Sequence, residues 1–163
     1  MQLRSPNPDD HAAIREVVRA AFDKSRFDEA GVIDGVRAEN AIAVELVAVE
    51  GDEVLGHVLF SRMTCDPSAF IVGLGPVAVS PAHQNKGIGE ALCRIGLAAC
   101  ADLGAAGAVV LGHPTYYPRF GFSREAALPL RSPFSDLPAF MAMPLVSGGL
   151  DGVVEVAYPA AFG

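Results

Sequence analysis

The sequence predicts an α/β (α+β) fold in which a mixed central sheet carries helices on both faces. Three observations predict it. Segments with helical spacing of apolar residues alternate with β-type runs along the chain. Residues 70–79 are almost all apolar, which is typical of a central strand buried on both faces. A short polar loop with two glycines follows that run and leads into a long segment of helical spacing.

The N-terminal third of the sequence predicts two helices and then two strands. They are expected over residues 10–24, 28–40, 44–50 and 54–63. Asp9 and Asp10 can cap the first helix, because a short acidic side chain accepts from the N–H groups of a first turn. The loop Gly51-Asp52-Glu53 between the two β-type runs predicts a hairpin.

Beyond the central strand, the pattern predicts one long helix and then shorter elements. They are a helix over 87–104, a strand over 108–111, a short helix around 115–120, and strands near 121–126, 139–146 and 152–158. The buried stripe of the long helix is expected at Ile88, Leu92, Ile95, Ala99 and Leu103. The proline-rich stretch 129–138 is expected to be an ordered loop, and the turn Gly148-Gly149 to let the last two strands pair.

Composition limits the class of protein. The chain has 163 residues, 51% hydrophobic and 19% charged, which favours a single folded domain over residues 1–163. No apolar run approaches the ~18–20 residues of a membrane span, and the N-terminus lacks the apolar core of a signal peptide, so we expect a cytoplasmic protein without a membrane partner. The net charge of −7 and the absence of a basic cluster argue against nucleic acid as a partner. The three cysteines lack metal-type spacing, so no metal is expected, and Cys93 and Cys100 are expected to pack in the core.

The polar loop after the central strand predicts an anion site. It reads Gln84-Asn85-Lys86-Gly87-Ile88-Gly89 and lies between a strand and a helix. This layout aims backbone N–H groups and a helix N-terminus at an anion, usually a phosphate. Gly87 and Gly89 lack the Cβ that would hold a phosphate away. We therefore predict a site for a phosphorylated cofactor.

An interruption in the central strand has two interpretations. Pro76 has no N–H to donate, so sheet pairing fails locally at Gly75-Pro76. One interpretation is a plain bulge. The other is that two neighbouring strands part there and leave backbone groups that an extended ligand can pair with.

Two motifs in this order resemble those of a known family. Gln84-Asn85-Lys86-Gly87-Ile88-Gly89 resembles the Q/R-x-x-G-x-G/A acyl-CoA motif of the GNAT N-acetyltransferase superfamily. Further on, Tyr116-Tyr117-Pro118-Arg119-Phe120-Gly121-Phe122 resembles the Y-x-x-x-G-F signature of that superfamily. The surrounding residues are similar to a bacterial branch of predicted N-acetyltransferases with a GPVAV…QxxGIG…YYPRFGF pattern. The resemblance implies the GNAT acyl-CoA N-acyltransferase fold, with acetyl-CoA as the acetyl donor.

The resemblance also implies roles for single residues. The pyrophosphate would lie on the backbone N–H groups of Gln84, Asn85, Lys86, Gly87, Ile88 and Gly89, and the pantetheine arm along the backbone of Val77 and Val79. The side chains of Lys86 and Gln84 could add donors. Tyr117 stands four residues before Gly121, as the family's catalytic tyrosine does, and would give a proton to the departing thiolate. Its neighbour Tyr116 is the competitor for that role.

Some roles stay open. The general base is Glu45, Glu50, His57 or His113, or the proton leaves through water. Arg119 either meets a phosphate of CoA or is a surface charge. Many family members carry an asparagine shortly before the tyrosine, and the corresponding segment here, Val109-Val110-Leu111-Gly112-His113, has none.

The expected function is that of an acetyl-CoA-dependent N-acetyltransferase that transfers an acetyl group to a primary amine of a small molecule or a protein by direct attack. The alternative is a GNAT-fold sensor or partner domain that binds CoA or an acyl-CoA without turnover. A third interpretation, a nucleotide-phosphate domain, is poor, because the glycine loop lacks a Gly-Lys-Ser/Thr pattern and no acidic residue stands where a ribose would be bound. The sequence does not identify the acceptor, and a homodimer is expected only because dimers are common in the family.

Overall fold

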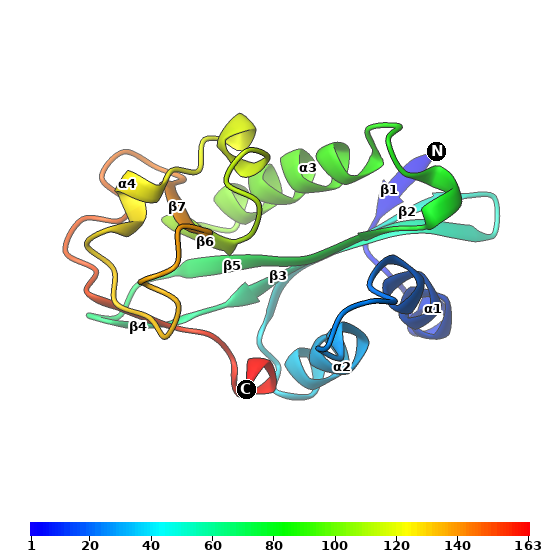
Figure 1. Cartoon of the computed structure of the whole chain (residues 1–163), viewed down its shortest axis with the longest axis horizontal. Coiled ribbons are helices and arrows are strands. Elements are labelled where there is room, and N and C mark those ends of the chain that lie inside the picture. The colour runs from blue at the N-terminus through cyan, green and yellow to red at the C-terminus, as the bar shows by residue number, and fades with distance from the viewer.

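The computed structural model describes all 163 residues and shows a sheet with helices on both faces (Figure 1). Helices α1 (His11–Ala21) and α2 (Glu29–Ala38) lie on one face. Helix α3 (Ile88–Asp102) lies on the other. The predicted α/β architecture is therefore confirmed. None of the helices has both the length and the apolar character needed to span a membrane.

The main sheet has six strands in the order β1-β2-β3-β5-β6-β7. These are β1 (Gln2–Arg4), β2 (Ile42–Glu50), β3 (Glu53–Arg62), β5 (Ile71–Val79), β6 (Gly107–Leu111) and β7 (Phe140–Pro144). Only β5 and β6 run parallel, because α3 connects them across one face of the sheet. A separate two-stranded ribbon pairs β4 (Thr64–Asp66) with β8 (Glu155–Ala157).

Apolar side chains fill both sides of the sheet. The cluster under α3 includes Phe60 and Leu92, and the cluster under α1 and α2 includes Ile14 and Ile33. Phe60 packs so closely on α3 that a Cβ at Gly96 would collide with its ring. Cys93 and Cys100 belong to the cluster under α3, so their predicted place in the core is confirmed.

The predicted stripe on α3 is partly wrong. Ile88 and Leu92 are buried, but Ile95 is 48% and Leu103 is 55% exposed. The buried face instead continues through small residues, namely Cys93, Gly96 and Cys100. Small residues let the helix approach Phe60, and this close approach rotates the larger side chains at 95 and 103 toward solvent.

The elements after β6 also differ from the prediction. Residues 121–126 do not form a strand, because Ser123 caps the short helix α4 (Arg124–Ala127) by accepting from the N–H of Ala126 at 3.1 Å. The last two strands do not pair with each other, since β7 joins β6 and β8 joins β4. The first helix is shorter than 10–24, with a 3-10 turn at Pro8–Asp10 before it.

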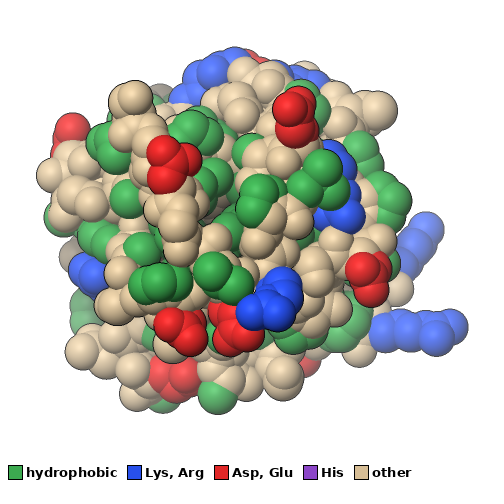
Figure 2. Space-filling model, turned by 90° about the vertical axis from the view of Figure 1, so that its left-hand side faces the viewer, with side chains coloured by type: hydrophobic (Ala, Val, Ile, Leu, Met, Phe, Trp, Pro, Cys, Tyr) green, Lys and Arg blue, Asp and Glu red, His purple; other side chains and the backbone are tan.

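The end of the molecule that α4 and its neighbouring loops form has a mixed surface. Basic and acidic side chains are interspersed there, with hydrophobic side chains between them (Figure 2). This face therefore carries no concentrated patch of one charge.

Candidate functional site

Strands β5 and β6 part in the middle of the sheet. Their pairing runs from Ile71 opposite Gly107 to Leu74 opposite Val110 and then stops. Residues 77–79 of β5 pair only with β3. The break coincides with Gly75, whose φ of +133° favours glycine, and with Pro76, which has no N–H. The structure shows both interpretations of this interruption: the register of β5 against β3 shifts between Leu74 and Val77, as in a bulge, and β5 parts from β6 beyond Leu74.

The second half of β5 leaves an unpaired edge. The carbonyl of Val79 accepts a hydrogen bond from the Gln84 side chain at 3.0 Å, so it faces away from β3. Alternate residues of a strand direct their backbone groups to the same side, so Val77 faces the gap as well. The side-chain amide of Gln84 is therefore already hydrogen-bonded. The backbone N–H of Gln84 is the donor that remains for a ligand.

The loop after β5 presents free backbone donors. The N–H groups of residues 84–87 donate to no carbonyl or side chain, and those of the first turn of α3 have no preceding turn to bond to. Asn85 and Gly87 adopt left-handed backbone conformations, with φ of 62° and 83°. Successive N–H groups in such turns converge on an anion, and the positive end of the α3 dipole adds to the attraction.

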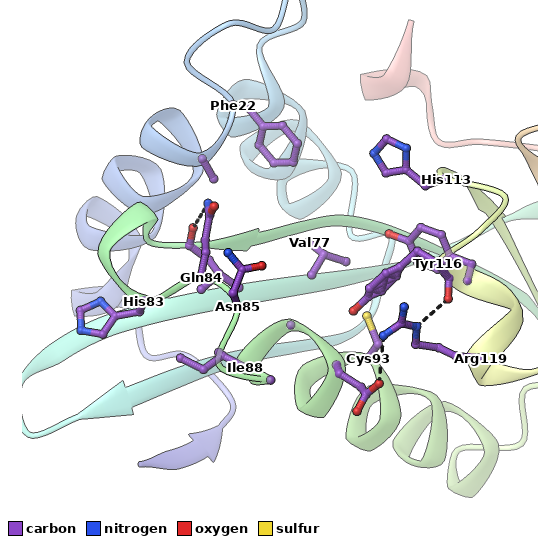
Figure 3. A pocket seen from close by; sticks show the side chains of 16 residues that line it. Phe22, Val77, His83, Gln84, Asn85, Ile88, Cys93, His113, Tyr116 and Arg119 are labelled. Atoms are coloured by element: carbon purple, nitrogen blue, oxygen red, sulfur yellow. Dashed lines mark hydrogen bonds and ion pairs between the residues drawn. The ribbon is translucent and has the colours of Figure 1, made fainter.

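These groups surround one cavity of about 680 Å³ (Figure 3). Of the sequence-predicted site residues, Val77, Val79, Gln84, Asn85, Gly87, Ile88, Gly89 and Tyr117 line it. Lys86 is exposed and does not line it. The volume lies within the ~300–1,000 Å³ typical of small-molecule sites.

The cavity fits a diphosphate-bearing cofactor. Gly89 lines the cavity at the start of α3, and a Cβ built on it would stand 3.6 Å from Val79 Cγ2. A side chain there would thus occupy the space in front of the free N–H groups. Its absence leaves that space to a ligand.

Two tyrosines also line the cavity, and the hydroxyl of Tyr116 lies 3.9 Å from the place that a Cβ of Gly89 would take. The ring of Tyr117 packs over Gly112, where a Cβ would collide with it, and meets Phe122 edge-on at 6.0 Å. Burial raises the pKa of Tyr117, so its phenol stays protonated at neutral pH. The ring of Tyr116 also lines the cavity, 5.1 Å from the ring of Tyr117. The geometry thus brings both tyrosines to the cavity.

Arg119 is held in place by its neighbours. Its guanidinium lies 4.1 Å from the ring centre of Tyr116, and its Nε donates to the Tyr116 carbonyl at 2.9 Å. It also forms an ion pair with Glu90 at 3.3 Å (Figure 3). These contacts fix the side chain at the rim of the cavity.

Comparison with known proteins identifies the family. The family model of the acetyltransferase (GNAT) domain matches residues 42–124, about half of the chain. The chain belongs to the GNAT family. Its predicted fold is confirmed, and the expectation of an N-acetyltransferase is confirmed at the level of the family.

Several GNAT relatives are similar over most of the chain. The uncharacterized N-acetyltransferase YjhQ of Escherichia coli K12 is 36% identical over 69% of this chain and 64% of its own length, which is just under two thirds of that relative. The uncharacterized N-acetyltransferase YhbS of Escherichia coli is 30% identical over 94% of this chain and 92% of its own length. The crystal structure of YhbS in complex with CoA has a TM-score of 0.88 and covers 99% of this chain and 91% of that chain. A GNAT acetyltransferase from Brucella melitensis in complex with acetyl-CoA is 36% identical, with a TM-score of 0.81, and covers 99% of this chain and 97% of that chain.

The candidate general bases of this GNAT protein lie in three places. His113 lines the cavity and is exposed. Glu50 is exposed at the end of β2. Glu45 and His57 are buried and hydrogen-bonded to each other at 2.8 Å, outside the set of residues that line the cavity.

Sequence reasoning missed two kinds of cavity residue. Ala21 and Phe22 reach the cavity from the end of α1, and no motif marks them. Cys93 was expected only in the core, but it also borders the cavity while remaining 1% exposed. Burial raises the pKa of the Cys93 thiol to about 12, so it is a protonated packing group rather than a nucleophile.

Proposed function

We propose that this protein binds acetyl-CoA in the gap between β5 and β6 and transfers the acetyl group to a primary amine by direct attack. One observation carries the proposal: an unpaired strand edge, a loop of free N–H groups and a protonated tyrosine all border one cavity. The relatives crystallised with CoA and with acetyl-CoA support the same cosubstrate.

The chain divides the binding of the cosubstrate between two elements. The N–H groups of residues 84–89 hold the pyrophosphate at the N-terminus of α3. The backbone of Val77 and Val79 pairs with the amide groups of the pantetheine arm, as a neighbouring strand would. The parted strands thus supply the edge along which the cosubstrate lies.

The residues at the gap then serve the chemistry. Acetyl-CoA supplies a thioester whose carbonyl carbon is attacked by a neutral amine, so that a C–N bond forms and the C–S bond breaks. A backbone N–H of Val77 or Val79 stabilises the negative charge that develops on the carbonyl oxygen. Tyr117 donates its proton to the departing thiolate, whose conjugate acid has a pKa near ~8.5.

The test is an amine screen with acetyl-CoA and detection of the released thiol, run on the wild type, Tyr117→Phe and Tyr116→Phe. We expect Tyr117→Phe to lower kcat by about 10–1000-fold, because a general acid commonly contributes ~10²–10⁴. Its affinity for CoA, measured by calorimetric titration, should not change. Tyr116→Phe is the matched control and should retain its kcat. Unchanged turnover in Tyr117→Phe would remove this residue from the mechanism.

The same screen decides the alternative of a CoA or acyl-CoA sensor without turnover. One observation favours that alternative: among the four predicted base residues, only the exposed His113 lines the cavity. Tight CoA binding without acetylation of any amine would establish it. The cytoplasmic location, the homodimer, the single domain over 1–163 and the lack of nucleic-acid partners stay predictions.

A further inference from the structure

The cavity is lined from both faces of the sheet. Helices α1 and α3 lie on opposite faces (Figure 1), yet residues of both helices line the same cavity. Phe22 at the end of α1 and Cys93 of α3 border it from the two sides (Figure 3). Because the phosphates of the cosubstrate would lie at the N-terminus of α3, the acceptor amine has its approach on the α1 side.

A buried charged cluster lies on this α1 side of the sheet. Arg37 at the end of α2 donates to both oxygens of Glu45, at 2.8 and 2.9 Å. The Nε2 atom of His57, on the neighbouring strand β3, lies 2.8 Å from Glu45 Oε1. Glu45 is 8% exposed, and His57 is fully buried.

The contacts of Glu45 decide which nitrogen of His57 carries the proton. Burial opposes ionisation of Glu45, but the hydrogen bonds from His57 and Arg37 outweigh it and lower the pKa of the carboxyl to about 2. An ionised carboxylate only accepts hydrogen bonds, so Nε2 of His57 must be the donor. In the neutral ring, Nδ1 therefore carries the free lone pair.

That lone pair has no partner in the protein. Nδ1 of His57 is a buried polar atom without a hydrogen bond, and such an atom in a folded protein requires an explanation. His57 alternates on β3 with Val58, which belongs to the cluster under α3, so its ring lies on the other face of the sheet, which α1 and α2 cover. Glu45 is hydrogen-bonded to the ring, and Arg37 is hydrogen-bonded to Glu45.

The part of β5 that is unpaired on its β6 side lies opposite this histidine. Ala78, its cross-strand partner on β5, stands between the two cavity-lining residues Val77 and Val79. At Gly75, where β5 leaves β6, nothing lies within 4 Å of the place a Cβ would take. Water can enter that open space, and buried polar atoms such as Nδ1 are the groups that internal water binds.

We propose that Nδ1 of His57 is the proton acceptor of the acetyl transfer, reached through water beside the strand break, and that Glu45 is the residue that positions its ring. The proposal rests on the function proposed above and names a base for it. A purely structural role would not require a free nitrogen on the ring. Here the carboxylate of Glu45 holds the proton on Nε2 and leaves Nδ1 free to accept another.

The proton balance is simple. The acceptor arrives as an alkylammonium, with a pKa near ~10.4, and must lose one proton before it attacks. Water passes that proton to Nδ1, which gives an imidazolium paired with the carboxylate of Glu45. The neutral amine then forms the C–N bond as the C–S bond breaks, and Tyr117 protonates the thiolate. The nitrogen loses its second proton, which restores the phenol of Tyr117, and His57 returns its own proton to water after the product leaves.

The test is the pH dependence of kcat/KM for His57→Gln, measured with an amine from the screen. Glutamine keeps a side-chain N–H for Glu45 but has no basic nitrogen. At pH 7 we expect a loss of about 10²-fold or more. The loss should shrink toward pH 10, because the amine then loses its proton in bulk solution. A loss by the same factor at every pH would overturn the proposal.

Tyr158→Phe is the matched control. It also removes a buried polar atom that has no partner, but Tyr158 makes no contact with Glu45. Its pH profile should coincide with that of the wild type. If Tyr158→Phe reproduced the profile of His57→Gln, the effect would come from loss of a buried polar group and the proposal would fail.

A measurement on the wild type covers the case in which His57→Gln does not fold. Imidazole ¹⁵N NMR should show His57 protonated on Nε2 with a bare Nδ1 at pH 8, whereas a proton on Nδ1 in a neutral ring would overturn the proposal. If the wild type acetylates an amine and His57→Gln has the same pH profile, then His57 is not the base, and the proposed acetyl transfer still holds. Failure of every amine would remove both.

Discussion

Substitution of Gly89 gives the most direct test of the proposed cofactor loop. We expect Gly89→Val to weaken CoA binding by at least about tenfold, or ~1.4 kcal/mol, because the new side chain would fill the space before the free N–H groups. Folding should persist, since a Cβ there meets no atom closer than 3.6 Å. Calorimetric titration and thermal melting measure the two effects.

The matched control for Gly89→Val is Ala98→Val, which places the same β-branched side chain on the exposed side of α3. It should bind CoA as the wild type does. Normal affinity in Gly89→Val would contradict the loop assignment.

Residues that act through the backbone could be predicted, because the features they need are local. Gly87 and Gly89 stand where the loop after a strand passes into a helix, and Pro76 has no N–H in any fold. The bond between Glu45 and His57 could not be predicted in the same way. It depends on the register of β2 and β3, which two irregularities shift. The sequence therefore marks both residues without showing that they meet.

At the scale of one element, the contact of α3 with the sheet depends on Gly96. We expect Gly96→Ala to lower the free energy of unfolding by about 1–3 kcal/mol, because its Cβ would collide with the ring of Phe60 in a filled core. Helix propensity alone would favour alanine by ~1 kcal/mol, so the sign of the change separates the two effects. Urea denaturation gives the value.

Ala98→Gly on the exposed side of the same helix calibrates the propensity term, with an expected loss of about 1 kcal/mol. A Gly96→Ala variant more stable than the wild type would show that Phe60 can move aside. The close packing of α3 on β3 would then not be required.

Most strands and the long helix could be predicted from their apolar patterns, and two very short strands could not. The bounds of β5 and of helix α3 lie close to the predicted ranges, although the buried stripe of α3 differs, and β8 lies within the predicted strand near 152–158. β1 and β4 have three residues each, which is too short for an alternation to be visible. The prediction of a strand near 121–126 was wrong, because the hydrogen bond from the Ala126 N–H to the Ser123 hydroxyl begins helix α4 there.

For the whole molecule, Glu45 links stability to pH. Its carboxyl has a pKa of about 2 in the folded protein, against ~4.3 in an unfolded chain, and this difference contributes about 3 kcal/mol at neutral pH. Because the folded pKa is the lower one, this contribution is complete above about pH 5 and is lost as the pH falls toward 2. Denaturation across that range should show the loss.

Glu45→Gln is the comparison variant. It should be less stable at pH 7 by about 3 kcal/mol and should lose less stability on acidification. Some acid sensitivity would remain through Asp10, because the hydrogen bond from Arg4 lowers the pKa of that carboxyl to about 2 as well. Parallel pH curves for Glu45→Gln and the wild type would contradict the buried ion pair as the source.

The architecture could be predicted at this scale, and the proposed cofactor loop lies in one unit of strand, loop and helix that the sequence marks. The residues proposed to serve the acceptor could not be placed together from the sequence. They come from the end of α1 and from β2 and β3, which meet only after the sheet forms. Their types, such as Phe22 and Glu45, make no motif.

A cavity lined from both faces of a sheet has a kinetic consequence under the proposed function. Two reactants that enter from different faces can arrive in either order, and neither product blocks the exit of the other. Burial keeps Cys93, the cysteine at the cavity, as a thiol that does not store the acetyl unit. The proposed direct attack then requires donor and acceptor to meet in one ternary complex, between the two strands that part after Leu74.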